Sequence, residues 1–167
     1  MNFDPTYNYG DTDLTQDENL VRWKFSELIK NLVTLSSSAK QQAEIIGFGA
    51  TCDEMAIDFD TYFTLEYQDY LDNGLLTILQ VEKLRELDEY FEDRSGNKSP
   101  DFWDDLLLET SSEWQNVRQQ AKNILEALNM QDLIIEFDRI EKYDTTNKGE
   151  RLTMQTTRTR LVKQNAS

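Results

Sequence analysis

Apolar residues recur at helical spacing through most of this chain, and that periodicity constrains its fold more than any other feature. One apolar stripe is formed by Val21, Phe25, Leu28, Ile29 and Leu32. The clearest stripe is formed by Trp114, Val117, Ala121, Ile124, Leu125 and Leu128. Because each stripe must be buried against another element, the pattern predicts a bundle of packed helices.

Residues typical of helix N-termini mark where these helices begin. Thr15 with Glu18, and Thr77 with Gln80, have the spacing of a capping box, in which the two side chains satisfy backbone N–H groups of the first turn. Further starts are predicted at the Ser36-Ser37-Ser38 cluster, near Asp53, at Ser99-Pro100 and at Thr110 with Glu113.

Glycine and asparagine mark where the helices end. Gly47, Gly74, Gly96 and Asn129 each follow the last apolar position of a predicted helix, where a residue that tolerates positive φ is favoured. These limits predict about five to six helices in a helical domain of residues 15–129. Residues 1–14 carry aromatic side chains among polar ones and are predicted to form an extended N-terminal arm.

The segment 130–167 has a different composition. Residues 133–137 and 152–157 are rich in β-branched side chains, and the polar stretch 145–149 separates them. This predicts a β-hairpin or a basic extended tail, with a helix through Phe137 and Ile140 as the alternative. Two strands alone are marginal, so we expect them to pack on the helices, pair with another chain or remain mobile. The predicted fold class is therefore mainly α, a helical bundle with a C-terminal β-hairpin or extended arm.

The net charge restricts the partners. With 17 Lys and Arg against 32 Asp and Glu, the formal charge is −15. Such a field repels nucleic acid and anionic membranes and attracts a basic protein, although acidity can also serve solubility alone. No stretch approaches the roughly 18–20 apolar residues of a membrane span, and the N-terminus lacks the features of a secretory signal. The single cysteine, Cys52, excludes an internal disulfide, so we expect a cytoplasmic protein.

Most familiar catalytic and cofactor sites are excluded by composition. The chain has no His, so it cannot build a Ser-His-Asp or Cys-His constellation or an ordinary Cys/His zinc site. It also has no Walker A loop and no G-x-G-x-x-G motif, since Gly47-Phe48-Gly49 lacks the rest of that pattern. Cys52 has no basic neighbour in sequence and is predicted to be an inert thiol. We therefore predict no catalytic residue and no cofactor.

The carboxylates of the third predicted helix could form either a metal site or a polar surface. Asp53, Glu54, Asp58 and Asp60 lie within eight residues, and Glu54 and Asp58 share a helical face. Such a group could ligate Mg²⁺ or Ca²⁺, but the segment lacks the glycine and the final glutamate of an EF-hand loop. A metal site also needs carboxylates from a second helix. We therefore predict a solvated or partner-facing surface and no metal site.

Aromatic residues on the third and fourth predicted helices divide into core and surface. Phe59, Tyr62, Phe63 and Tyr70 follow the apolar stripe and are predicted to be core. Tyr67 and Tyr90 lie among acidic residues, a composition suited to an interface that receives Lys and Arg. The predicted partner-binding residues are Asp53, Glu54, Asp58, Asp60, Glu66, Tyr67, Asp69, Glu86, Asp88, Glu89, Tyr90, Glu92 and Asp93.

The stretch from Ile45 to Leu128 resembles small acidic helical bacterial proteins of the type found as immunity partners of polymorphic toxins. The resemblance is carried by IIGFGATCDEMAIDFDTYF, YLDNGLLTILQVEKLRELDEYFEDRSG, FWDD and SSEWQNVRQQAKNILEAL. It covers roughly the central half of the chain, and none of its shorter words (DEMAIDFD, NGLL, EW-x2-VR) is a catalytic signature. The resemblance implies an inhibitor role and does not identify the toxin. The N-terminal arm and the C-terminal tail lie outside it.

Three functional hypotheses follow. The leading one is a protein-binding inhibitor, an immunity protein or antitoxin that neutralises a basic effector such as a nuclease through its acidic surface. The second is a metal-dependent hydrolase that uses carboxylates alone. The third is a structural adaptor that forms homo-oligomers through its C-terminal strands.

Overall fold

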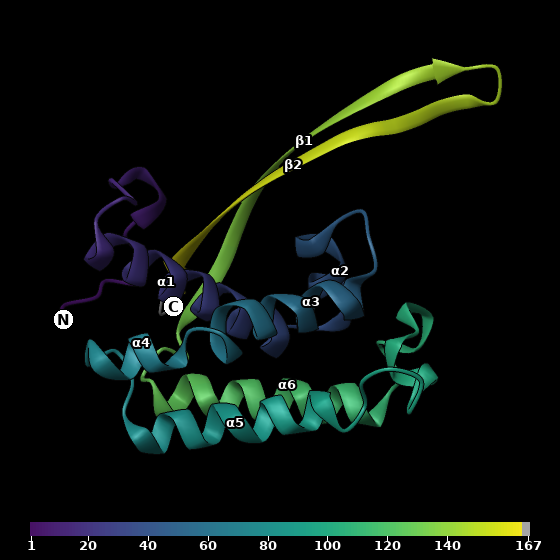
Figure 1. Ribbon diagram of the computed structural model, residues 1–167. Coiled ribbons are helices and arrows are strands. Elements are labelled where there is room, and N and C mark those ends of the chain that lie inside the picture. Colours follow the sequence, from purple (N-terminus) through teal and green to yellow (C-terminus); the bar gives the residue numbers. More distant parts are fainter. Residues whose placement is uncertain (165–167) are drawn as a thin grey trace.

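The computed structural model describes residues 1–164 and shows a helical body with a long hairpin (Figure 1). The helices are α1 (Asp17–Ser36), α2 (Ala39–Ile46), α3 (Thr51–Phe59), α4 (Tyr67–Asp72), α5 (Ile78–Glu92) and α6 (Ser112–Ala127). A π-helical turn spans Asp60–Thr64, and 3-10 turns span Tyr9–Asp11, Pro100–Trp103 and Asp105–Leu107. The strands β1 (Leu133–Thr146) and β2 (Gly149–Lys163) form an antiparallel pair. The prediction of a mainly α fold with a C-terminal β-hairpin is confirmed.

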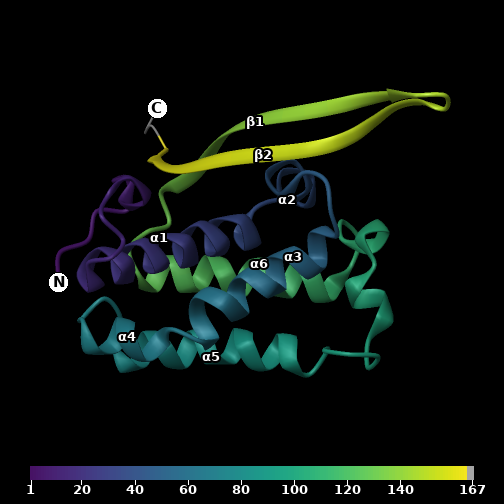
Figure 2. The same ribbon diagram turned by 45° about the horizontal axis from the view of Figure 1, so that its top comes forward.

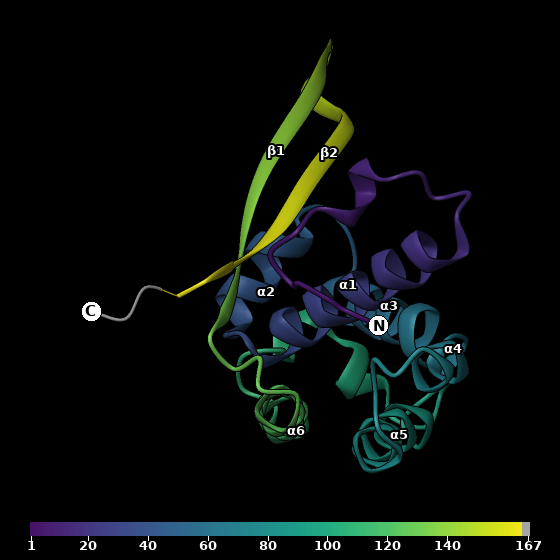
Figure 3. The same cartoon turned by 90° about the vertical axis from the view of Figure 1, so that its left-hand side faces the viewer.

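The elements form layers. Helices α5 and α6 run side by side, and α1 and α3 lie between that pair and the hairpin (Figure 1). In the turned view the hairpin runs above α1 and α2 (Figure 2). Viewed from the end, α2 lies on the hairpin side of α1, and the hairpin rises away from the body (Figure 3). The apolar faces of α1, α3, α5 and α6 therefore meet in the middle of the body.

Aromatic side chains fill much of this core. Trp114 is fully buried and stacks on Phe102, with ring centroids 4.6 Å apart and an interplanar angle of 5°. Its Nε1 donates a hydrogen bond of 2.6 Å to the Phe102 carbonyl. Phe91 packs against both rings. Each such side chain contributes roughly 1.5–3 kcal/mol through burial, so this cluster is a main source of stability.

Two predicted capping residues prove wrong. Thr15 does not cap α1, because its backbone N–H and its hydroxyl both bond to Asp13 Oδ1, at 3.0 and 2.6 Å, and form a local turn instead. Helix α1 begins at Asp17 without a side-chain cap. The cap of α6 is Ser111, not Thr110, and its hydroxyl accepts from the Trp114 N–H.

Two other predicted starts are confirmed. Thr77 and Gln80 form the capping box of α5, with both reciprocal bonds present. The serine cluster caps α2 through Ser38, which forms a capping box with Gln41. These residues satisfy N–H groups that the first helical turn leaves unpaired.

The third predicted helix is interrupted. The π-helical turn Asp60–Thr64 separates α3 from α4. The Tyr70 hydroxyl donates a hydrogen bond of 2.5 Å to the Tyr62 carbonyl, in this turn. Insertion of a side chain into the backbone ladder is a known cause of such breaks. The break keeps Phe59, Phe63 and Tyr70 buried although the helix changes direction.

The hairpin is anchored at its base and free at its tip. Leu133 and Leu161 are buried in the core, whereas all residues from 141 to 150 are exposed. The register runs from Leu133↔Lys163 to Thr146↔Gly149, with a bulge between Lys142 and Tyr143. The predicted helical alternative is wrong, since Phe137 and Ile140 both lie within β1. The last three residues of the predicted C-terminal segment, 165–167, lie outside the residues that the structure describes.

A polar latch ties the hairpin to α2. Arg139 donates from Nη2 to the carbonyls of Glu44 and Ile45, at 2.6 and 2.9 Å, near the C-terminal end of α2. Gln155 Oε1 accepts from the Phe48 N–H at 2.9 Å. Gly47, between these segments, has a φ of +75°, and a Cβ there would lie 2.6 Å from Gln155 Oε1. Only glycine therefore fits beneath the hairpin at this point.

Removing the latch should loosen the hairpin. We expect Arg139→Ala to lower the free energy of unfolding by about 1–2 kcal/mol, because two charge-assisted bonds to backbone carbonyls are lost. Urea denaturation and amide hydrogen exchange would measure the change. Arg158→Ala, on the exposed side of β2, is the matched control. Equal effects of the two variants would contradict the latch.

Candidate functional site

A groove of about 690 Å³ lies between α3 and α5. The segment that follows α5 supplies the rest of its lining. Its lining residues are Asp53, Ala56, Ile57, Phe59, Asp60, Asp88, Phe91, Glu92, Ser95, Gly96, Asn97, Pro100 and Trp103. The groove therefore joins acidic residues that the sequence places on two different helices.

Helical geometry explains which residues reach the groove. At ~100° per residue, Asp53, Ile57 and Asp60 share one side of α3 and its continuation. On α5, Asp88 and Glu92 lie one turn apart on a single side. The two sides face each other across the groove.

The floor of the groove is apolar and aromatic. Phe59 and Phe91 pack with ring centroids 5.7 Å apart and are only 1% and 7% exposed. Ile57 is 56% exposed, a large apolar side chain open to solvent inside the groove. Trp103, half-buried, lines the groove from the segment that follows α5. Aromatic floors of this kind favour tight protein contacts.

Charge distinguishes the groove from an ordinary apolar depression. Four carboxylates line it, from Asp53, Asp60, Asp88 and Glu92, and no Lys or Arg of residues 1–164 does. None of the four forms an ion pair within the described part of the chain. Asp88 is oriented by the Thr64 hydroxyl, which donates to its Oδ1 at 2.9 Å. The groove is therefore complementary to a cationic, partly apolar segment.

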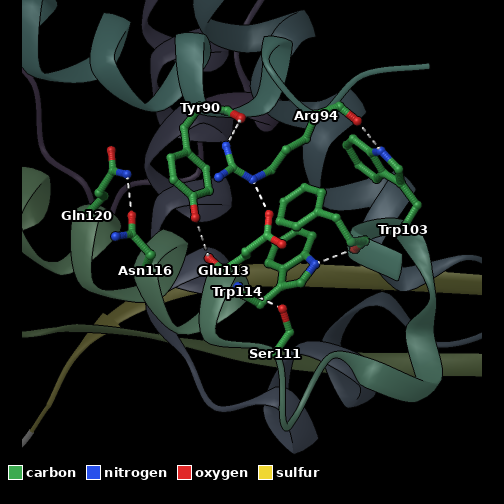
Figure 4. Close-up of polar contacts among 9 residues, drawn as sticks. Tyr90, Arg94, Trp103, Ser111, Glu113, Trp114, Asn116 and Gln120 are labelled. Carbon is green, nitrogen blue, oxygen red and sulfur yellow. Dashed lines mark hydrogen bonds and ion pairs between the residues drawn. The ribbon is translucent and has the colours of Figure 1, made fainter. Parts of the chain in front are cut away.

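Arg94 holds Trp103 in place beside the groove. Its guanidinium lies 3.5 Å from the Tyr90 ring centroid and pairs with Glu113 (Figure 4). Its carbonyl accepts from Trp103 Nε1 at 2.7 Å. The backbone carbonyl of Arg94 thus positions Trp103, and the positive charge of its side chain is matched by Glu113 on α6.

The N-terminus of α3 is capped from a distance. Asp105 accepts from the backbone N–H groups of Thr51 and Cys52, at 3.0 and 2.9 Å, 54 and 53 residues away in sequence. A carboxylate at this position also favours the helix dipole. Burial, together with Asp105, raises the pKa of the Cys52 thiol, which suits the inert role predicted for it.

The remaining predicted partner-binding residues lie outside the groove. Glu66 forms an ion pair of 2.8 Å with Lys24. The Tyr67 ring lies 4.8 Å from the Arg85 guanidinium, and Tyr90 contacts Arg94 as described above. Asp69 is exposed on α4, and Glu86 and Glu89 are exposed on a neighbouring side of α5. Asp93, the exposed C-cap of α5, follows on that side.

Glu54 and Asp58 line a second cavity. It holds about 330 Å³ and lies between α1, α3 and the hairpin. Burial raises the pKa of Asp58 to about 6, and the negative charges of Glu54 and Glu27 add to the effect. The acidic residues of α3 are thus divided between two sites on different sides of one helix.

Several residues of these sites were not predicted from sequence. Ile57 and Trp103 line the groove and are exposed or half-buried, but an isolated apolar side chain gives no signal of exposure in the sequence. The exposure of Ile57 follows from its position four residues after Asp53, which places both on one face. Asn31, which lines the second cavity, gave no sequence signal.

Neither a metal cluster nor a membrane helix is found in the described chain. Among residues 1–164, no three or more carboxylate or cysteine side chains converge closely enough to hold a metal ion. No helix in that range is long and apolar enough to cross a bilayer. Comparison of the chain with protein-family models, curated proteins and solved structures gave no match. The resemblance to immunity proteins therefore stays a prediction.

Asp58 should make stability depend on pH. Its pKa is raised to about 6 in the folded chain, so its contribution to stability is present at low pH and is lost as pH rises through that value. Relative to Asp58→Asn, the wild-type chain should lose about 1 kcal/mol of unfolding free energy between roughly pH 5 and 7.5, allowing for partial exposure. Urea denaturation at both pH values measures this. Asp60→Asn, a change at an exposed position that leaves Asp58 in place, should lose as much unfolding free energy over this pH range as the wild-type chain. If the difference in unfolding free energy between wild type and Asp58→Asn is the same at both pH values, the raised pKa of Asp58 is contradicted.

Proposed function

We propose that this protein binds a basic protein partner through the groove between α3 and α5. The observation that carries this proposal is the meeting of four carboxylates without a basic neighbour over an aromatic floor. A basic segment with one or two apolar side chains would pair its cations with the rim and bury its apolar groups against Ile57 and Trp103, above the buried rings of Phe59 and Phe91.

The role we propose for this binding is inhibition, as in an immunity protein or antitoxin. The resemblance of residues 45–128 to immunity partners supports it, and so do the contacts that hold the walls of the groove. Arg94 pairs with Glu113 on α6 and accepts from Trp103, and Asp105 caps α3. A rigid acidic surface can cover the cationic cleft of a nuclease at little conformational cost. The only cysteine is buried, and we place this function in the cytoplasm.

The hairpin supports a second candidate, the adaptor. Ile140, Tyr143 and Met154 are 60%, 51% and 41% exposed on the projecting part of the hairpin. Both strand edges there are unpaired within residues 1–164, so a second copy could pair with them. This candidate and the groove are compatible, since they use different parts of the molecule.

The groove proposal is tested by affinity capture with charge-reversed variants. The tagged chain is incubated with lysate of its source cells at low and high salt, and retained proteins are identified by mass spectrometry. We expect a basic protein that is retained stoichiometrically and released by salt. Asp60→Lys with Glu92→Lys should weaken its binding at least about tenfold, because two attractive charges become repulsive.

The matched control is Glu109→Lys with Glu126→Lys. These exposed acids lie outside the groove, and their reversal changes the net charge by the same amount. Binding that survives in the control and fails in the groove variant supports the proposal. Equal loss in both would mean that overall charge, not the groove, governs binding. The activity of the captured protein with and without the chain then tests inhibition.

A further inference from the structure

The second cavity lies on the opposite side of α3 from the groove and has no part in the proposed function. Helices α1 and α3 form its inner wall, and the hairpin and the end of α2 form the rest. Its lining residues are Glu27, Lys30, Asn31, Thr34, Ile45, Ile46, Phe48, Glu54, Asp58, Tyr62, Ile135, Gln155, Thr157 and Thr159. Carboxylates and apolar side chains therefore line the same cavity.

The charges in this cavity do not balance. Three carboxylates line it, and Lys30 is its one cation among the described residues. The Lys30 ammonium pairs with Glu27 at 3.1 Å. Asp58 forms no ion pair within residues 1–164, and its environment contains the further negative charges of Glu54 and Glu27. A partly buried carboxylate without a counter-ion is costly, and a bound cation would offset that cost.

Asn31 supplies an independent observation. Its side chain is 6% exposed, and its Nδ2 donates a hydrogen bond of 3.0 Å to the Met55 carbonyl. Its Oδ1 is buried and has no hydrogen-bond partner in residues 1–164. Nearly all buried polar atoms in folded proteins are paired, so this oxygen calls for a donor. Asn31 and Asp58 line the same cavity, so a donor bound there has both an unpaired amide oxygen and an unmatched carboxylate in its lining.

We infer that this cavity binds a primary alkylammonium group, the group carried by a lysine side chain or by a small aliphatic diamine. The ammonium has three N–H donors and no acceptor, which suits Asn31 Oδ1, Asp58 and Glu54 as acceptors. Its alkyl stem would lie against the apolar side chains of Ile45, Ile46 and Ile135. This inference does not depend on the function proposed for the groove.

The lining favours an organic cation over a metal ion. Oxygen ligands must approach Mg²⁺ or Ca²⁺ within about 2.0–2.6 Å. No acidic group of residues 1–164 converges closely enough for that. An alkylammonium makes longer hydrogen bonds of about 2.7–2.9 Å and tolerates acceptors that lie farther apart.

The test uses the full chain and two probes, Nα-acetyl-lysine N-methylamide and putrescine. Each is titrated at low salt while the Asn31 side-chain amide and the backbone amides of the cavity are followed by NMR. We expect saturable shifts at those positions with at least one probe. Binding of the lysine amide indicates a protein side chain as the natural occupant, and binding of putrescine alone indicates a free diamine.

Variants separate this site from general attraction to an acidic protein. Asp58→Asn keeps the shape of the side chain and should weaken binding about tenfold or more, and Glu54→Gln should weaken it less. Asp60→Asn, on the groove side of α3, should leave it unchanged. Tetramethylammonium has the charge without N–H donors and should not compete. The inference is overturned if neither probe binds saturably, if Asp58→Asn binds as well as wild type, or if tetramethylammonium or Mg²⁺ binds there better.

Discussion

The anchoring of α3 is the constraint on which the rest of this structure depends. Asp105 caps its first turn, Asn31 binds the Met55 carbonyl in its middle, and Phe59 fixes its end in the aromatic core. These contacts set the rotation of the helix about its own axis. Since neighbouring residues differ by ~100°, that rotation decides which carboxylates face α5 and which face α1. The division of the acidic residues between two sites is therefore a consequence of packing.

The excess negative charge is not spread evenly over the molecule. Several acids are matched locally, as in the pairs of Glu66 with Lys24 and of Glu136 with Arg160. The groove lacks such matching, and so does Asp58 in the second cavity. Exposed ion pairs contribute little to stability, whereas unmatched carboxylates beside apolar surface give a protein capacity to bind cations. Charge alone predicted a basic partner, and the structure shows where uncompensated charge and apolar surface coincide.

Local patterns predicted much of the fold. Apolar periodicity located the helical segments, and the Thr77 capping box placed the start of α5, because both depend on residues close in sequence. The π-helical break could not be predicted, because the apolar pattern gives no sign that the Tyr70 hydroxyl bonds to the backbone carbonyl of Tyr62. The cap from Asp105 and the latch from Arg139 could not be predicted either, because each joins residues more than fifty positions apart in the sequence. The groove was missed for the same reason, although four of its acidic residues were named.

Zero-length carbodiimide cross-linking of the complex tests the central claim most directly. The reagent joins a carboxylate only to a lysine in contact with it, so mass spectrometry of the cross-linked peptides names the acids that meet the partner. The account predicts cross-links from the basic protein to Asp53, Asp60, Asp88 or Glu92. Cross-links confined to Glu86, Glu89 and Asp93, or to the acidic residues of the hairpin, would contradict it and place the interface elsewhere.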